Sequence, residues 1–421
     1  MRHDDRVPSD TASSLPTART RRRADAVLTV SGPDRPGVTA RLFTALAEGV
    51  PAVEVLDVEQ VVVHGQLVLG VVVGALPLGD EFDPPALTSG LEVLAAGVAD
   101  ATGLQVSVQP AGVSSGPAAP RRAHHVILLG PVVSPGAVAG AATAIAGCGA
   151  NIDAIRRLSD YPVTSFELTV SGGDATGLRS ALAGVAAAAG VDVAVEPVGL
   201  ARRSKRLIVL DVDSTLVRGE VIDSLAARAG REAEVARITA AAMNGELDFA
   251  ESLRARVGAL AGLPVAVLDE VREALELTPG ARTLIRTLQR LGFRCGIVSG
   301  GFTQITDRLA ADLGLDFAAA NTLEVADGRL TGGLVGEIVD RAGKARALAR
   351  FAGEYGIPLE QTVAVGDGAN DLDMLNAAGL GIAFNAKPVV RQQAHAALNQ
   401  PYLDAVLQVL GFTRDEVLDA Q

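Results

Sequence analysis

The chain has 421 residues, 48% of them hydrophobic and 20% charged, which is enough for about three globular domains. Its formal net charge of −12, together with 10 Phe, 3 Tyr and no Trp, argues against general nucleic-acid binding, which requires basic grooves and aromatic stacking surfaces. Two Cys exclude a disulfide framework and five scattered His offer no zinc-binding spacing, so we expect a protein of the reducing cytoplasm.

The N-terminal residues 1–25 are rich in Arg, Asp, Ser, Thr and Pro, and we expect them to form a disordered tail. They contain no apolar stretch of the kind that a signal peptide requires. The longest uncharged run, residues 126–152, is long enough to span a bilayer, but Pro131, Pro135 and several Gly interrupt it. This composition predicts a strand, a turn and a helix of small residues, so we expect no membrane span.

Two similar segments follow, residues 26–109 and 124–198, joined by a linker at 110–123 that is rich in Pro, Gly and Ser. They begin AVLTVSGPDRPG and HHVILLGPVVSPG, and each beginning predicts an apolar strand, a Gly-Pro turn and the start of a helix. Each segment continues with two strand-like runs, a helix and a final strand. The order βαββαβ, found twice, predicts two ferredoxin-like modules.

The repeated segment resembles the ACT domain, a small module that binds amino acids where modules meet. The resemblance rests on the turn Asp34-Arg35-Pro36-Gly37 and its counterpart Ser134-Pro135-Gly136. It implies an effector site in which Gly37 and Gly136 admit a ligand to the backbone, Asp34 binds its ammonium group and Asn151 contacts it from a facing module. The second turn lacks an equivalent of Asp34. Ordinary strand-to-helix turns also favour Pro and Gly, so a purely structural role is the alternative.

Residues 199–421 change to alternating strands and helices, the pattern of a doubly wound α/β fold with a parallel sheet. Short apolar runs predict its strands at 207–210, 294–298, 362–365 and 380–384. Polar or Gly-rich residues directly follow three of these runs. Because ligands bind beyond the carboxyl ends of such strands, these residues form the candidate site.

Acidic residues follow the first and the third predicted strands. Asp211 and Asp213 come after the first strand, and Asp367 and Asp371 come after the third. Carboxylates gathered at one edge of a sheet repel one another, so this pattern favours a divalent cation or divided acid and base roles.

The second predicted strand and a later helix supply hydrogen-bond donors and a positive charge, in contrast to these carboxylates. Ser299 and Gly300 offer a hydroxyl and a free backbone amide before a helix, which suits a phosphate. Lys344 lies in a predicted helix and supplies a positive charge. Each of these pieces is common by itself, whereas all of them in this order are specific.

The order DxDxT, Ser, Lys and GDxxxD resembles that of the haloacid dehalogenase superfamily of phosphatases. The resemblance implies a phosphoryl transfer in two steps, with Asp211 as the nucleophile and Asp213 as the general acid and base. It implies that Mg²⁺ is bound by Asp211, Asp213 and Asp367, with Asp371 orienting metal-bound water. The residues that it implies for the phosphoryl oxygens are Ser299, Gly300 and Lys344.

The insertion at about residues 217–278 is helical by composition and predicts a cap over the active site. The stretches DVDSTLVRGEVID, MNGELDFAESLRARV, VSGGF and VGDGANDLDML resemble the phosphoserine phosphatase family. The resemblance implies that Glu220 binds the ammonium group of phosphoserine and that Arg256 binds its carboxylate. The other substrate contacts that it implies are Met243, Phe249 and Asn370. Without the resemblance, charged residues on a helical cap are more often simply solvated.

We therefore expect an enzyme that hydrolyses O-phospho-L-serine to L-serine and phosphate, the last step of serine biosynthesis, with L-serine as an effector at the ACT modules. The alternatives are a phosphatase or phosphotransferase acting on another phosphate monoester, and a non-catalytic amino-acid sensor. Exposed sheet edges on the modules predict a homodimer, with a tetramer as the alternative. We expect no nucleic-acid or membrane partner.

Overall fold

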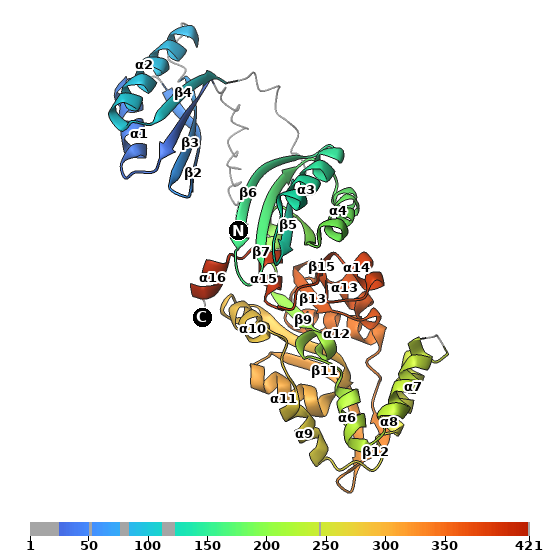
Figure 1. Ribbon diagram of the computed structural model, residues 1–421. Helices are drawn as coiled ribbons and strands as arrows, with labels where there is room; N and C mark the ends of the chain where they lie inside the picture. Colours follow the sequence, from blue (N-terminus) through green and yellow to red (C-terminus); the bar gives the residue numbers. More distant parts are fainter. Residues whose placement is uncertain (1–24, 50–52, 76–83, 112–122, 244–245, 420–421) are drawn as a thin grey trace, which may run out of the picture. The chain divides into compact units, whose positions relative to one another are not determined.

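The computed structural model describes residues 25–49, 53–75, 84–111, 123–243 and 246–419. The chain divides into two compact units, Met1–Ala119 and Pro120–Gln421 (Figure 1). Apart from Asp25, the tail predicted at 1–25 lies outside the described residues, as does most of the linker predicted at 110–123. Within the described ranges, no helix has both the length and the apolar character needed to cross a bilayer.

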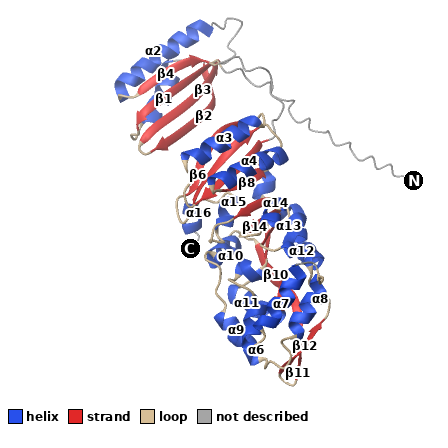
Figure 2. Cartoon of the chain, turned by 45° about the vertical axis from the view of Figure 1, so that its right-hand side comes forward, coloured by secondary structure: helices blue, strands red, loops and turns tan. Residues whose placement is uncertain are grey.

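The first unit contains a four-stranded antiparallel sheet in the order β2-β3-β1-β4. Its elements are β1 (Ala26–Pro33), α1 (Val38–Gly49), β2 (Val53–Val63), β3 (Gln66–Ala75), α2 (Pro84–Thr102) and β4 (Gln105–Pro110). Residues alternate between buried and less buried along β1 and β3, because helices α1 and α2 pack against one face of the sheet (Figure 2). This is the βαββαβ order that the sequence predicts.

The second unit begins with a module of the same order. Its elements are β5 (Ala123–Gly130), α3 (Pro135–Gly147), β6 (Asn151–Ser159), β7 (Thr164–Ser171), α4 (Ala175–Ala189) and β8 (Asp192–Pro197). A short helix, α5 (Leu200–Arg203), connects it to the rest of the unit. Helices α3 and α4 cover one face of its sheet, with Ile145, Leu178 and Leu182 buried between them and the strands.

The remaining residues form the doubly wound α/β domain that carries the candidate site. Its strands and short 3₁₀ turns are β9 (Leu207–Leu210), β10 (Arg294–Phe302), η2 (Leu359–Gln361), β13 (Thr362–Gly366), η3 (Ala369–Asp371), β14 (Leu380–Phe384) and β15 (Ala396–Leu398). Its helices are α10 (Ala281–Arg290), α11 (Thr303–Leu313), α12 (Arg341–Glu354), α13 (Leu372–Ala377), α14 (Pro388–Gln393), α15 (Ala405–Val409) and α16 (Arg414–Asp419). Strands β10, β9, β13, β14 and β15 are parallel neighbours in this order, so the predicted fold class is confirmed.

The cap follows the turn η1 (Val212–Leu216) after β9. Its helices are α6 (Val221–Ala229), α7 (Glu232–Met243), α8 (Phe249–Gly258) and α9 (Ala266–Ala274). They pack on a hairpin that the sequence analysis did not identify, β11 (Phe317–Ala326) and β12 (Arg329–Val335). Leu323 and Leu330 of this hairpin are buried in the same cluster as Leu225 and Leu253 of the cap, and Phe302 at the end of β10 contributes to it, so the cap is joined to the α/β domain by a hydrophobic core.

The sheet of the second module continues into the sheet of the α/β domain. Strand β8 pairs with β15, which gives eleven strands in the order β12-β11-β10-β9-β13-β14-β15-β8-β5-β7-β6. Asp192 at the start of β8 accepts hydrogen bonds from the backbone and side-chain amides of Asn399, at 2.8 and 2.6 Å. The second module and the α/β domain therefore belong to one compact unit.

Candidate active site

The candidate site lies at the carboxyl end of β9, whose four residues are all buried. Asp211 follows the strand and is only 4% exposed, and its amide N donates a hydrogen bond to the carbonyl O of Val365 on the neighbouring β13. The chain then turns sharply, and Ser214 adopts a φ of +58°, which is unusual for a residue with a side chain. This turn returns Asp213 to the same end of the sheet as Asp211.

Lys344 occupies the centre of the site and is 0% exposed. It lies on α12, which is capped at its start by the Asp340 side chain. Its Nζ donates to Asp211 Oδ1 and to Asp371 Oδ1, both at 2.6 Å. A buried ammonium is stable only with such partners, so Lys344 holds these two carboxylates in fixed positions.

Asp213 is held by groups from two other segments. Its Oδ1 accepts a hydrogen bond at 2.7 Å from the amide N of Val221, at the start of the cap, and its Oδ2 accepts one at 3.3 Å from Ser299 Oγ. The amide N of Gly301 donates to the same Ser299 Oγ at 2.8 Å. The structure thus brings Asp213 and Ser299 together, as the sequence predicts for a phosphate site.

Three carboxylates of the site lie close enough to share a cation. Oxygen atoms of Asp211, Asp367 and Asp371 all lie within 4.8 Å of one another. Both oxygens of Asp371 already accept hydrogen bonds, from Lys344 and from the amide N of Gly368. Asp367 accepts a hydrogen bond at 3.1 Å from Thr215 Oγ1. An all-oxygen donor set with this excess of negative charge suits a hard divalent cation such as Mg²⁺.

Burial raises the pKa values of three carboxyl groups of the site. It raises the pKa of Asp211 well above its usual value, and the neighbouring Asp371 adds to the effect. It also raises the pKa of Asp213, against the hydrogen bond from Val221, and brings the pKa of Asp367 to about 6. Burial alone would lower the pKa of Lys344, but Asp211 and Asp371 raise it above its usual range. The cost of burying these carboxylates is thus offset in part by the charge of Lys344.

The cap places one acid and one base over this end of the sheet. Glu220 precedes α6 and accepts a hydrogen bond at 3.0 Å from Ser214 Oγ, and Arg256 lies on α8 with its Nε donating to the carbonyl O of Ser252. Burial, followed by the charge of Asp213, raises the pKa of Glu220 to about 7. Burial lowers the pKa of Arg256, whereas the charges of Glu220, Asp223 and Asp213 raise it. The charge of Glu220 acts on Arg256, but the two side chains form no ion pair among the described residues.

The backbone of Gly300 lies against two of the predicted substrate contacts. A Cβ at Gly300 would be 3.3 Å from the Phe249 ring and 3.9 Å from Asn370 Nδ2, so these side chains border the Ser299–Gly300 turn. Met243 is the last residue of α7, and its side chain lies outside the described residues. The roles given to these residues stay predictions.

Two further buried side chains support the site and were not identified from the sequence. Thr278 Oγ1 donates at 2.7 Å to the carbonyl O of Thr215. Asn321 Nδ2 donates at 2.8 Å to the carbonyl O of Gly300, and its Oδ1 accepts from the amide N of Val339 at 2.8 Å. Each is a single polar residue in an unremarkable stretch, and only its tertiary contacts show its role.

Comparisons with known proteins agree with this geometry. A model of haloacid dehalogenase-like hydrolases matches residues 208–376, and two ACT-domain models match residues 25–99 and 122–196. The chain is 57% identical over 397 residues to the phosphoserine phosphatase SerB2 of Mycobacterium tuberculosis, covering 94% of this chain and 95% of that one. The chain belongs to the phosphoserine phosphatase family. It is an enzyme of the haloacid dehalogenase-like type that carries two ACT domains.

Other relatives extend the same likeness. The phosphoserine phosphatase of Streptomyces coelicolor is 56% identical and covers 92% of both chains. Among solved structures, a probable phosphoserine phosphatase from Vibrio cholerae in unliganded form is 36% identical, with a TM-score of 0.54, and covers 70% of this chain and 88% of that one. The likeness to these phosphatases thus covers the ACT modules as well as the α/β domain.

The residues predicted to bind an effector lie on the two ACT modules. In the first module, Gly37 has a φ of +92° and directly precedes α1, and Asp34 is exposed in the same turn. In the second module, Gly136 lies in the first turn of α3, next to Ser134, whose Oγ accepts a hydrogen bond from the amide N of Ala137. Asn151 begins β6, and its Nδ2 donates to Asp153 Oδ1 at 2.8 Å. No contact tests these four assignments, and they stay predictions.

Proposed function

We propose that this phosphoserine phosphatase works through an aspartyl-phosphate on Asp211 and requires Mg²⁺. The observation that supports the proposal best is the fixed position of Asp211, which Lys344 holds at 2.6 Å beside the acid pair Asp367 and Asp371. One oxygen of Asp211 bonds to Lys344, which leaves the other to approach phosphorus. A bound Mg²⁺ would reduce the repulsion between this anionic nucleophile and the anionic phosphate.

The first step forms one bond and breaks another at phosphorus. Asp211 attacks phosphorus, the bond between phosphorus and the serine oxygen breaks, and Asp213 donates its proton to that oxygen. Burial raises the pKa of Asp213, which favours the protonated form that this step needs. Ser299 and Lys344 lie where they can donate hydrogen bonds to the phosphoryl oxygens as their charge changes.

In the second step, the Asp213 carboxylate takes a proton from a water molecule. That water attacks phosphorus, the bond to Asp211 breaks, and inorganic phosphate leaves. Since the Asp213 carboxyl group first donates and then accepts a proton, its protonation state is restored after one turnover.

The mechanism is tested by rapid acid quenching of the enzyme mixed with radiolabelled phosphoserine and Mg²⁺. We expect acid-stable label on the wild-type protein, which hydroxylamine removes as it does from acyl phosphates. The Asp211→Asn variant should carry none. Label that persists in Asp211→Asn, or turnover that is unchanged in EDTA, contradicts the proposal.

We propose Asp211, Asp367 and the backbone carbonyl of Asp213 as the Mg²⁺ ligands. Asp371 uses both of its oxygens for Lys344 and Gly368, which suits a residue that orients metal-bound water. Titration of Mg²⁺ into the metal-free enzyme, followed by calorimetry, should show one site that Asp367→Asn weakens strongly. Equal affinity in the wild type and in Asp367→Asn would exclude this assignment.

We propose that Glu220 and Arg256 select phosphoserine by binding its ammonium and carboxylate groups. The charge of Asp213 acts on both side chains, and they form no ion pair with each other in the described part of the chain, so both charges stay available to a zwitterion. The Phe249 ring beside Gly300 would form an apolar wall of the pocket, together with Met243, and Asn370 would help to position the phosphate.

We also propose that L-serine regulates the enzyme at the ACT modules through Asp34, Gly37, Gly136 and Asn151. The open space around Gly37 supports close approach of a ligand to the backbone. Added L-serine should change turnover of wild-type enzyme and have less effect on Asp34→Ala. Equal responses would show that Asp34 is not part of an effector site.

The proposed homodimer is supported by strands with uncovered side chains. Val58, Val61 and Val63 on edge strand β2 are 42%, 54% and 58% exposed, and Ile155 on edge strand β6 is 54% exposed. Unpaired, apolar edge strands favour association. Light scattering should therefore give the mass of two chains or a multiple of it.

A further inference from the structure

The joint between the second ACT module and the α/β domain has two unlike faces. On one face the two parts share a continuous core, in which Ile127 and Leu129 of β5 are buried in one cluster with Leu403 and Val406. Arg202 of the connector is also buried there, donates to the carboxylate of Glu167 on β7, and donates to the carbonyl O of Val409 at 3.0 Å. This face is closed.

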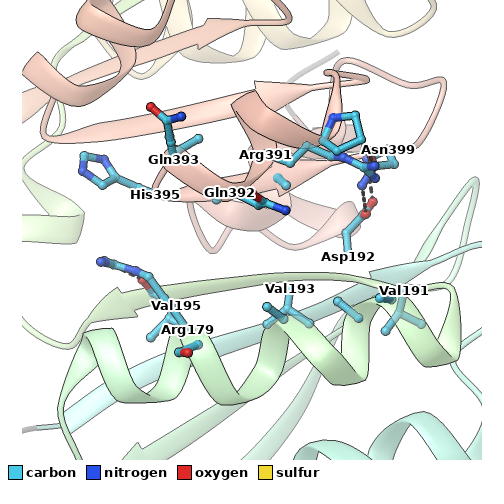
Figure 3. A pocket seen from close by; sticks show the side chains of 18 of the residues that line it. Arg179, Val191, Asp192, Val193, Val195, Arg391, Gln392, Gln393, His395 and Asn399 are labelled. Carbon is cyan, nitrogen blue, oxygen red and sulfur yellow. Dashed lines mark hydrogen bonds between the residues drawn. The ribbon is translucent and has the colours of Figure 1, made fainter. Parts of the chain in front are cut away.

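The opposite face of the joint is a groove of about 700 Å³, which we call the joint groove. One wall consists of α4 and β8 of the module, and the other of α14 and β15 of the α/β domain (Figure 3). Strands β8 and β15 pair at a single position, Ala194 with Ala396, so backbone pairing closes little of this side. Cavities of about 300–1,000 Å³ between two structural parts are typical of small-molecule sites.

Two hydrogen-bond donors face each other at one end of the joint groove, one from each wall (Figure 3). Arg179 of α4 donates through Nη2 to the carbonyl O of Val195 at 3.3 Å, and its Nε is buried with no hydrogen-bond partner in the described part of the chain. His395 accepts a hydrogen bond at Nδ1 from the amide N of Gly381 at 2.9 Å, so its ring proton is on Nε2. Burial, followed by the charges of Arg179 and Lys205, lowers the pKa of His395.

At the other end of the groove lies a carboxylate whose oxygens already accept hydrogen bonds. Asp192 accepts hydrogen bonds from Asn399 and, at 3.1 Å, from Gln400 Nε2. Arg391 also lines this end and is exposed (Figure 3). Among the lining residues, the charges are two arginines against one aspartate whose oxygens already accept hydrogen bonds, and the nearby buried carboxylate of Glu196 is compensated by Lys205 before Arg179. The groove has an excess of positive charge to offer a ligand.

The middle of the joint groove is apolar. Val193 of β8 is partly exposed along its floor, and Ala183 and Ala187 expose the small side chains of α4 to it. A ligand with only polar groups would leave this surface uncovered, whereas an apolar body would bury it. An anionic group at Arg179 and His395 and an apolar body over these residues would use the whole length of the groove.

We propose that the joint groove binds a small organic anion with an apolar body, whose anionic group lies between Arg179 and His395. Such a ligand contacts the module and the α/β domain at once and therefore stabilises the joint on its open face. This site is separate from the effector turns at Gly37 and Gly136. It does not depend on the phosphatase mechanism, because its ligand does not contact the residues of the active site.

The proposal is tested by titrating the full chain with anilinonaphthalene sulfonate, a fluorescent apolar anion, in the absence of metal and substrate. We expect saturable binding that Arg179→Gln weakens by about tenfold or more, since it removes the charge that faces the anion. The matched control is Arg157→Gln, which removes an exposed arginine of β6 in the same module and should leave the affinity unchanged.

A second pair of variants changes the shape of the groove without changing its charge. Ala187→Trp fills the apolar middle and should abolish this binding, whereas Ala188→Trp places the same side chain on an exposed position of α4 outside the groove lining. Displacement of the dye by octanoate, and about tenfold weaker displacement by octanol, would show that the anionic group is recognised. Equal dye affinity in the wild type, Arg179→Gln and Ala187→Trp overturns the site, and equal displacement by octanol overturns the anion preference.

Discussion

The two ends of the active site differ in how their charges are paired. At the phosphoryl end, Lys344 contacts two carboxylates at 2.6 Å each, and all three groups are buried. At the cap end, Arg256 and Glu220 lie near each other and form no ion pair in the described part of the chain. The phosphoryl end is therefore assembled before substrate arrives, whereas the cap end leaves two opposite charges free to bind a zwitterion. Changes at the first end should affect every substrate, and changes at the second only those with an amino-acid group.

The largest expected effect is that of Asp211→Asn. Removing the proposed nucleophile should lower kcat by more than about 10³-fold for phosphoserine and for p-nitrophenyl phosphate alike, because both need the same attack on phosphorus. Phosphate release measures the effect. Asp307→Asn, at an exposed acid of α11 away from the site, is the control and should be close to wild type. A deficit confined to phosphoserine would contradict the role of Asp211.

Lys344→Met should abolish turnover and also weaken the fold. It leaves Asp211 and Asp371 buried without their cation, which typically costs about 3–5 kcal/mol of unfolding free energy. Urea unfolding measures the loss near neutral pH, in the absence of metal. Lys387→Met, at an exposed lysine just before α14, should unfold like the wild type. An unchanged unfolding midpoint for Lys344→Met would mean that the charge cluster is not held by this lysine.

Arg256→Ala should affect the cap end of the site and leave the phosphoryl end unchanged. The loss of a charge-assisted contact to the carboxylate should lower kcat/KM for phosphoserine by about 100-fold and leave p-nitrophenyl phosphate nearly unaffected. Arg254→Ala removes an exposed arginine two positions earlier on α8 and serves as the matched control. Comparable losses on both substrates would indicate that Arg256 does not bind the carboxylate of phosphoserine.

The smallest expected effect is a pH dependence at the cap end. Glu220 has a raised pKa of about 7, so its carboxylate is mostly ionised at pH values above this and mostly protonated below it. Because only the carboxylate attracts an ammonium group, KM for phosphoserine should rise as the pH falls through this value. The reference is p-nitrophenyl phosphate, which has no ammonium group, and Glu220→Gln should lose the difference between the two substrates. Parallel profiles for both substrates in the wild type would contradict the assignment.

Much of this fold follows from local patterns in the sequence. The repeated Gly-Pro and Pro-Gly turns indicate two βαββαβ modules, and four buried apolar runs that end in polar motifs indicate the α/β sheet. The hairpin β11 and β12 was missed. Its strands carry small residues and Gly, such as Gly332 and Gly333, and they pack on the cap, which precedes β10 in the chain.

In the site, too, some residues are recognised from local sequence motifs and others only from their tertiary contacts. Asp211, Asp213, Ser299, Lys344 and Asp367 stand out because each follows a buried strand or fits a spaced motif. Thr278 and Asn321 form no motif, and their importance comes from backbone groups distant in the chain that they hold. The connector after β8 is rich in Arg and Lys, residues that are usually solvated, whereas its Arg202 is buried against Glu167 of the module and the carbonyl of Val409. Burial of that kind depends on how segments pack and cannot be read from spacing.

The continuous eleven-stranded sheet also affects which domain could be lost from such a chain during evolution. The first ACT module has its own sheet and core, so its fold needs no strand from the rest of the chain. The second module shares a core with the α/β domain, and its deletion would uncover β15 and the apolar residues beneath it. A lineage that lost the second module would therefore need compensating surface substitutions on β15.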